Sequence, residues 1–234
     1  MLIEAGTADA IAGGHRDRLT TVLVDCGPDM RAQLLDASVG HLDGVVVTHA
    51  HADHILGIDD LRQLWIKWNR RVDVYLDQAT LERISFGFGY CFEQASGSSY
   101  PAFCNARLIE AAKPFCVEGA GGEVCLTPVQ VEHGDIHALG LRIGDALYLP
   151  DVKTVQLAAS RELLGGLQLL ILDALRYKSH PTHMSLDEAL AFIKETAPAR
   201  AVLTNMHGDM DYATLVNTLP EGVEPAYDGM SLTL

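Results

Sequence analysis

Short apolar segments alternate with amphipathic ones along the whole chain. β-branched and apolar runs predict strands at 20–25, 44–48, 72–76, 124–131, 138–143, 146–149, 167–172, 201–204 and 230–234. Apolar residues at helical spacing predict helices at 30–37, 55–68, 78–84, 185–196 and 212–219. Ser185 and Glu188 have the spacing of a capping box that opens the fourth of these helices. Strands and helices that alternate in this way predict an α/β fold, with sheets sandwiched between helices.

No repeat, linker or low-complexity tract interrupts this alternation, so we expect a single domain over 1–234. The least regular part is 85–122, a lid-like segment that mixes glycine and serine with aromatic residues. It holds five of the six phenylalanines, which are Phe86, Phe88, Phe92, Phe103 and Phe115. These rings are expected mainly to form a local core under a long loop, although they could also stack on a nucleobase.

Five cysteines, at 26, 91, 104, 116 and 125, are an odd number without CxxC spacing. This pattern argues against a disulfide framework and a zinc finger, and it favours buried free thiols in a reducing compartment. With 48% hydrophobic residues, the chain can bury a core without disulfides. Residues 1–14 lack the pattern of a signal peptide, and no apolar run is long enough to span a bilayer. We therefore expect a cytoplasmic protein.

The formal net charge of −14 disfavours nucleic acid and anionic membranes as partners. The tightest cationic cluster, Lys67, Arg70 and Arg71, falls at the expected end of a helix, where cations suit the helix dipole. We expect a small phosphorylated or nucleotide-like substrate, no large nucleic acid and no membrane, and a homodimer stays open.

The densest chemistry is the run His49-Ala50-His51-Ala52-Asp53-His54, which directly follows an apolar strand. Imidazole and carboxylate are ligands of Zn²⁺, Mn²⁺ and Fe. Four such donors within six residues can be divided between two adjacent metal ions. The alternative is a loop of solvated histidines. Three histidines and an aspartate within six residues are, however, improbable by composition alone.

This run resembles the HxHxDH signature of the metallo-β-lactamase superfamily. Further stretches resemble motifs of that family in the same order, namely 24–27, 132–134, 147–151 and 203–207. The resemblance implies an αββα sandwich, with two mixed sheets packed face to face and helices outside. It also implies that His49, His51 and His133 hold one divalent metal ion and that Asp53, His54 and His207 hold a second. Asp151 would bridge the two ions.

Two such ions lower the pKa of a bridging water, and the resulting hydroxide attacks the substrate. The catalytic candidates are Asp53 and His183. His183 and His180 both stand just before the helix at 185–196, and we favour His183 as the acid that protonates the leaving oxygen. Asp25 ends a strand and either accepts a hydrogen bond from a ligand imidazole or simply forms a turn. Arg176, Lys178 and His180 are candidates for holding a substrate phosphate.

Residues 183–190 and 227–230 resemble the branch that contains the phosphoribosyl cyclic-phosphate phosphodiesterase. Residues 1–18 lack the strand and Gly/Ser-rich loop common in the family, which leaves open a truncated N-terminal strand and loop. Asn205 follows Thr204 where the family often has Thr-His, and no cysteines match the separate structural zinc site of that branch. The favoured function is therefore hydrolysis of a small cyclic or nucleotide-like phosphodiester.

Three other functions stay open. One is a thioester or lactone hydrolase of the same fold. Another is a nuclease like the tRNA 3′-processing enzymes, although the basic arm of those enzymes has no counterpart here. The third, less favoured, is a non-catalytic metal-binding protein.

Overall fold

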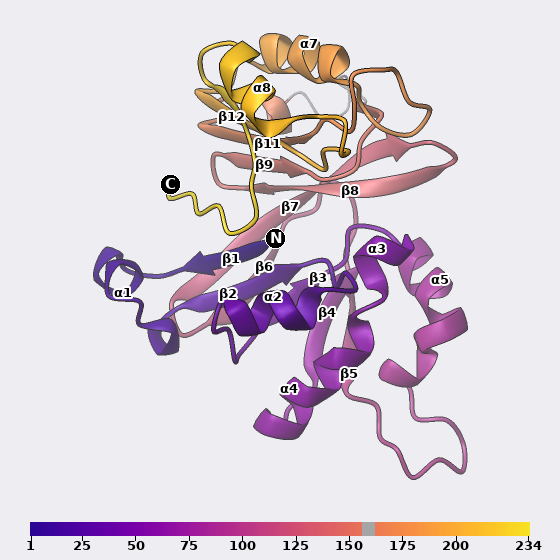
Figure 1. The fold of residues 1–234 in the computed structure, drawn as a ribbon. Helices are drawn as coiled ribbons and strands as arrows, with labels where there is room; N and C mark the ends of the chain where they lie inside the picture. The colour runs from indigo at the N-terminus through magenta and orange to yellow at the C-terminus, as the bar shows by residue number, and fades with distance from the viewer. Residues whose placement is uncertain (156–161) are drawn as a thin grey trace. The chain divides into compact units, whose positions relative to one another are not determined.

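The computed structural model describes residues 1–155 and 162–234, which divide into two compact units. The first unit comprises Met1–Glu110 and Phe115–Cys125, and the second comprises Ala111–Pro114 and Leu126–Leu234 (Figure 1). None of the described helices combines the length and the apolar character needed to cross a membrane.

The first unit is built on a sheet of five strands in chain order. These are β1 (Leu2–Ala5), β2 (Thr20–Val24), β3 (Gly44–Val46), β4 (Val72–Leu76) and β5 (Cys104–Leu108). β1 pairs antiparallel with β2, and the other neighbours are parallel. The three strands predicted at 20–25, 44–48 and 72–76 are confirmed. The sequence pattern did not reveal β1 or β5.

The helices of the first unit are α1 (Ala8–Ala12), α2 (Met30–Asp36), α3 (Ala52–Ile55), α4 (Leu61–Trp68) and α5 (Gln78–Phe88), with 3₁₀ turns at Arg16–Arg18, Ile58–Asp60 and Gly89–Cys91. The helix predicted at 55–68 is thus divided by a 3₁₀ turn. In Figure 1, α2 and α4 lie over the sheet of this unit, and α1 lies beside its β1–β2 edge. Met30 of α2 and Leu61 of α4 are buried in one core cluster with Val45 of β3 and Val74 of β4. Burial of such side chains stabilises the unit by roughly 1.5–3 kcal/mol each.

The second sheet runs in the order β10-β7-β8-β9-β11-β12-β13 among the described residues, and β6 also pairs with β7. Its strands are β6 (Phe115–Gly119), β7 (Gly122–His133), β8 (Ile136–Ile143), β9 (Ala146–Leu149), β10 (Thr154–Val155), β11 (Leu169–Asp173), β12 (Arg200–Thr204) and β13 (Val223–Pro225). β9, β11, β12 and β13 are mutually parallel neighbours, so their carboxyl ends lie at one edge.

Two helices of the second unit, α7 (Leu186–Thr196) and α8 (Tyr212–Thr218), confirm the predictions at 185–196 and 212–219. The Ser185 side chain accepts the Glu188 N–H, and the Glu188 side chain accepts the Ser185 N–H, so the predicted capping box is present. Ala189 and Phe192 of α7 pack in a cluster with Leu170 of β11.

The closing strand predicted at 230–234 is wrong. The edge position beside β12 is taken by Val223–Pro225, which pairs parallel with Ala201–Leu203. Met230 and Leu232 are apolar because they pack, partly buried, on a small cluster that includes Val202. The alternating apolar residues of 230–234 therefore belong to a C-terminal tail that packs on the protein without pairing to a strand.

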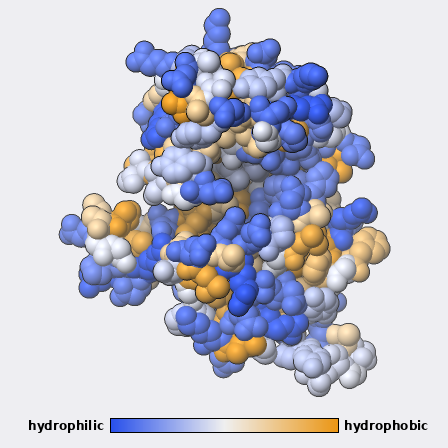
Figure 2. All heavy atoms as spheres, in the orientation of Figure 1, coloured by the Kyte–Doolittle hydropathy of each residue, from blue (hydrophilic) through white to orange (hydrophobic). Residues whose placement is uncertain are grey.

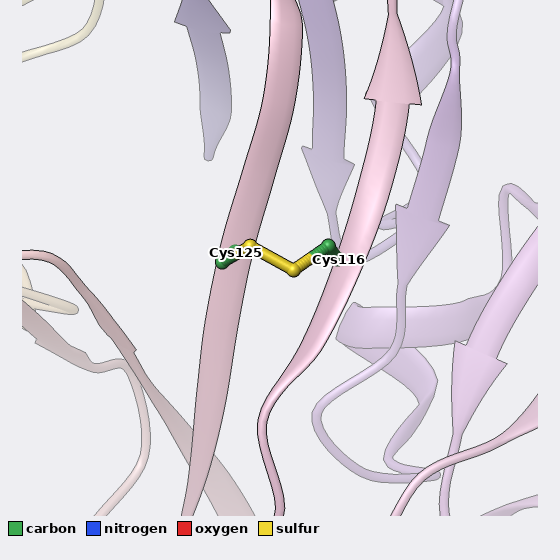
Figure 3. The surroundings of a disulfide bond; sticks show 2 residues. All are labelled: Cys116 and Cys125. Carbon is green, nitrogen blue, oxygen red and sulfur yellow. A yellow bond between two sulfur atoms is a disulfide. The ribbon is translucent and has the colours of Figure 1, made fainter.

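The expectation that all five cysteines are free thiols is wrong for two of them. Cys116 of β6 and Cys125 of β7 form a disulfide, with Cα atoms 4.0 Å apart (Figure 3). A spacing of nine residues matches no cysteine motif, so the sequence did not predict this bond. The two cysteines pair because neighbouring strands place them opposite each other. Cys26, Cys91 and Cys104 are buried free thiols, as expected.

The segment 85–122 is more regular than its composition indicates, since it contains β5 and β6. Phe103 is fully buried, and Phe88 and Phe92 pack against the same core, which confirms a local core. Phe86, in contrast, is 89% exposed. The face drawn in Figure 2 is mostly hydrophilic with separate apolar patches, as a strongly acidic chain leads one to expect.

Candidate metal centre

The histidine run follows β3 in the first unit. β2 and β3 are parallel, so the residues after each strand, Asp25 and Thr48, lie at the same edge of the sheet. His51 is the N-cap of α3, and Asp53 lies in the first turn of that short helix. The reversal from strand to helix turns the donors of the run back towards one another.

Asp25 organises this group. Its Oδ1 accepts the Thr48 N–H at 2.8 Å, and its Oδ2 lies 2.8 Å from His54 Nδ1. The carboxylate fixes the His54 proton on Nδ1 and presents Nε2, which lies 3.6 Å from Asp53 Oδ2. Asp25 has φ of 65°, a left-handed conformation that aspartate tolerates better than most residues. Asp25 thus contacts the imidazole of His54, and its role behind a metal ligand stays a prediction.

The other two histidines of the run lie beside His54. The ring of His49 is buried, and its centroid is 4.1 Å from that of His54 and 4.6 Å from that of His51. The ligand atoms of His49 and His51 lie within 4.8 Å of each other. The side chain of Asp53 is 71% exposed. The first unit thus brings the three histidine rings of the run together, and the partly buried carboxylate of Asp25 holds one of them, His54.

In the second unit, His133 ends β7 and is buried. Its Nδ1 lies 2.8 Å from the Thr182 carbonyl oxygen, which can only accept, so Nδ1 carries the proton. Its Nε2 lies 3.5 Å from Oδ2 of Asp151, a buried carboxylate two residues beyond β9. The structure therefore brings these two predicted ligands together.

Asp173 is a buried carboxylate that the sequence reasoning missed. Its Oδ2 lies 2.7 Å from His183 Nδ1 and accepts the Val152 N–H at 3.1 Å. Burial raises the pKa of Asp173 to about 6, although the hydrogen bond with His183 opposes that rise. The sequence did contain a signal for Asp173, because it ends an apolar strand, and Asp25 and Asp151 each come within two residues of the end of such a strand.

Asn205 ties these groups together. It follows β12, and its Nδ2 donates to Asp151 Oδ1 at 3.1 Å and reaches Asp173 Oδ1 at 3.4 Å. β9, β11 and β12 are parallel neighbours, which is why residues after their carboxyl ends meet. Asn205 stands where the family often has the histidine of a Thr-His pair, and its side-chain amide therefore donates to two carboxylates.

His180 and His183 lie near each other, with ring centroids 5.2 Å apart. His180 Nδ1 accepts the Thr182 N–H at 3.3 Å, and partial burial together with the charge of Arg176 lowers the pKa of His180. The Arg176 guanidinium donates to the carbonyl oxygens of Lys178 and Ser179, and the Lys178 side chain is exposed. A phosphate-binding role for these residues stays a prediction.

His207 is an exposed residue of the second unit. Its side chain is 64% exposed, and its Nδ1 lies 2.9 Å from Asp209 Oδ1. The His207 N–H donates to the Leu175 carbonyl oxygen at 2.7 Å, which fixes the backbone here. Its role as a metal ligand stays a prediction.

The chemistry of these donors fits divalent transition metals. His54, His133 and His207 each place Nδ1 within 2.9 Å of an oxygen acceptor, which leaves Nε2 as the ligand atom. Metal-binding histidines are usually held in this way by a carboxylate or carbonyl. The residues suited to hold metal are His49, His51, Asp53 and His54 in the first unit, and His133 and Asp151 in the second.

Comparisons with known proteins agree with this chemistry. The family described as "Beta-lactamase superfamily domain" matches residues 20–206. A crystal structure titled as a new diphosphatase from the PhnP family has a TM-score of 0.81 and 33% sequence identity, covering 92% of this chain and 80% of that one. The predicted α/β fold with two mixed sheets and helices is confirmed.

Two curated relatives are similar over different lengths. An octanoyltransferase of Porphyromonas gingivalis is 33% identical over 213 residues, which are 89% of this chain and 41% of that protein. The chain thus spans about two fifths of that relative. A ribonuclease Z of Bradyrhizobium sp. is 46% identical over 52 residues, 21% of this chain and 16% of that protein. The chain therefore belongs to the β-lactamase superfamily and has the metallo-β-lactamase fold of its PhnP-like branch.

Proposed function

We propose that this protein hydrolyses a small phosphodiester, cyclic or nucleotide-like. The observation that carries the proposal is the pairing of His183 with the buried carboxylate of Asp173, at 2.7 Å. Breaking a P–O bond requires a proton for the leaving oxygen, and an imidazole held by a carboxylate is suited to provide it. The similarity to a structure named as a diphosphatase, at 33% identity, supports phosphoryl chemistry.

The proposed cofactor is a pair of divalent ions, Zn²⁺ or Mn²⁺, with Fe as another choice. His49, His51 and His133 would hold one ion, Asp53, His54 and His207 the other, and Asp151 both. When bound, the ions supply Lewis acidity towards a water and positive charge beside the phosphoryl oxygens. The carboxylate of Asp53 also lies 3.6 Å from His54 Nε2, where it would orient the attacking water.

His183 holds the proton that the leaving group needs. Its Nδ1 faces Asp173, so Nε2 is the nitrogen that would deliver the proton to the leaving oxygen. Asp173 accepts from His183 and from the Val152 N–H, which keeps the ring in one orientation. The buried carboxylate also stabilises the imidazolium form before the transfer. His180, whose pKa is lowered by partial burial and by Arg176, is less suited to carry that proton.

The test uses the full chain loaded with Mn²⁺ or Zn²⁺. Bis-p-nitrophenyl phosphate, a thioester and a lactone are offered in parallel reactions. We expect hydrolysis of the phosphodiester, and His183→Ala should reduce it while metal content is retained. Hydrolysis of the thioester or lactone alone would overturn the proposal. No activity on any substrate with two metals bound would favour a binding protein.

A nuclease is the second candidate, because a 52-residue stretch is 46% identical to a ribonuclease Z. The net charge of −14 works against a long polyanion, since counterion release needs clustered cations on the protein. We therefore expect no cleavage of a tRNA precursor under conditions where the small phosphodiester is hydrolysed.

A further inference from the structure

The Cys116–Cys125 disulfide differs from the other cysteines of the chain in its exposure. Cys116 and Cys125 are both exposed to solvent, whereas Cys26, Cys91 and Cys104 are buried. Burial raises the pKa of Cys91 to about 12, and it raises the pKa of Cys26 and Cys104 as well. A thiol in solution can therefore reach the disulfide, while the other three cysteines are protected and unreactive.

We propose that the Cys116–Cys125 bond is a reversible redox site that opens and closes in the folded protein by exchange with a small thiol, and that Glu123 slows this exchange. Neither part depends on the proposed phosphodiesterase activity.

The hairpin should keep the two cysteines opposed when the bond is open. Val117 and Val124 alternate with the cysteines along β6 and β7, and they are only 1% and 4% exposed. The turn between the strands is held by Thr20, whose Oγ1 donates to the Gly122 carbonyl at 2.6 Å and accepts the Gly121 N–H at 3.1 Å. Because these contacts do not involve sulfur, the strands stay paired and the bond can form again.

Glu123 lies on the same face of β7 as Cys125, two residues away. A carboxylate oxygen of Glu123 and both sulfur atoms lie within 4.8 Å of one another. The cysteine that leaves during exchange departs as a thiolate, and a negative charge at this distance disfavours it. The same charge repels an incoming anionic thiol. Glu123 thus opposes both halves of the reaction.

The exchange consumes two thiols. A thiolate attacks one cysteine sulfur, the S–S bond breaks, and a mixed disulfide forms while the other cysteine leaves as a thiolate and takes a proton from water. A second thiolate then attacks the sulfur of the small thiol in the mixed disulfide and releases the remaining cysteine. The protein disulfide is reduced to two thiols, and the two small thiols are oxidised to one disulfide.

The test treats the folded full chain with reduced glutathione, traps thiols with iodoacetamide and counts the labels by mass spectrometry. We expect two labelled cysteines, at 116 and 125, and loss of both labels after oxidised glutathione is added before trapping. The Cys116→Ser, Cys125→Ser double variant should take up no label. Labelling that requires denaturant, or that includes the buried cysteines, would overturn the proposal.

Glu123→Gln tests the electrostatic part. Removing one charge at this distance should raise the rate constant of reduction by about three- to tenfold. Glu93→Gln, which removes an exposed charge outside the hairpin, is the matched control and should leave the rate unchanged. The comparison is repeated with uncharged 2-mercaptoethanol, for which a smaller acceleration should remain. Equal rates for the two variants would contradict a role for Glu123.

Discussion

His183 Nδ1 lies 2.7 Å from Oδ2 of Asp173, a carboxylate with no solvent exposure at the end of β11. This contact joins a histidine in a loop to a strand residue ten positions earlier in the chain. Because the carboxylate is also bonded to the Val152 N–H, the histidine is held by a fixed acceptor.

Replacing Asp173 with asparagine should reduce turnover strongly. The amide keeps the shape of the carboxylate but cannot stabilise a cationic His183, and its NH₂ group favours the wrong tautomer. We expect kcat for bis-p-nitrophenyl phosphate to fall by about 10²- to 10⁴-fold. Elemental analysis should show unchanged metal content, which separates proton transfer from metal binding. Wild-type turnover in this variant would contradict the role given to His183.

The same carboxylate should make stability depend on pH. The pKa of Asp173 is about 6 in the folded chain against 3.8 as its ordinary value, so folding favours the protonated form. Its contribution is complete below pH 4 and is lost as pH rises through 6, by about 3 kcal/mol at most. Urea unfolding of wild type and Asp173→Asn, both in chelator, measures this. The wild type should lose stability relative to the variant between pH 4 and pH 6. A constant difference would contradict the raised pKa.

Asp25→Asn should weaken metal binding. The amide oxygen can still accept the Thr48 N–H, but the NH₂ group then faces His54 Nδ1 and forces the proton onto Nε2. We expect the dissociation constant for Mn²⁺ to rise about 10- to 100-fold in equilibrium dialysis.

Asp43→Asn is the matched control for that change. Asp43 also accepts a backbone N–H, from Thr21 at 2.8 Å, and pairs with a histidine, His41, at 2.9 Å. Since this pair lies outside the HxHxDH run, metal affinity should not change. Equal effects of the two variants would show that Asp25 acts only on folding.

His51→Ala should lower the metal content sharply. The ring lies beside that of His49, with centroids 4.6 Å apart, and the side chain is exposed, so its loss should hardly affect the core. Elemental analysis of the purified variant measures the stoichiometry, with His41→Ala as the control. Unchanged metal content would defeat the assignment of this run as the metal centre.

The double variant Arg176→Ala, Lys178→Ala should raise KM for the phosphodiester by about tenfold, if a guanidinium or ammonium group holds a phosphate oxygen. Steady-state kinetics give KM and kcat separately, and the expected change is mainly in KM. Arg176 also donates to the Ser179 carbonyl at 2.9 Å, so its loss could alter the loop. A thermal unfolding curve therefore checks that the double variant keeps the stability of the wild type. Equal kinetics in the double variant would refute the phosphate role.

Much of the fold could be predicted from the local pattern. Apolar runs located β2, β3, β4 and most strands of the second sheet, because a buried strand needs apolar residues whatever its neighbours are. β5 was hidden, because Asn105 and Arg107 break up its apolar residues and leave no apolar run. The predicted strand at 230–234 failed because apolar residues can pack without joining a sheet.

The sequence by itself predicted the chemistry of the candidate metal centre, since four donors crowded into residues 49–54 have few other uses. Only the tertiary structure showed which carboxylates hold the histidines of the candidate site: Asp25 reaches His54 across 29 positions, and Asp173 reaches His183 across ten. It also paired Cys116 with Cys125. The physical reason is that periodicity and motifs are local properties of the chain. The partner of a buried carboxylate or thiol, in contrast, depends on which strand ends and strand faces the fold brings together.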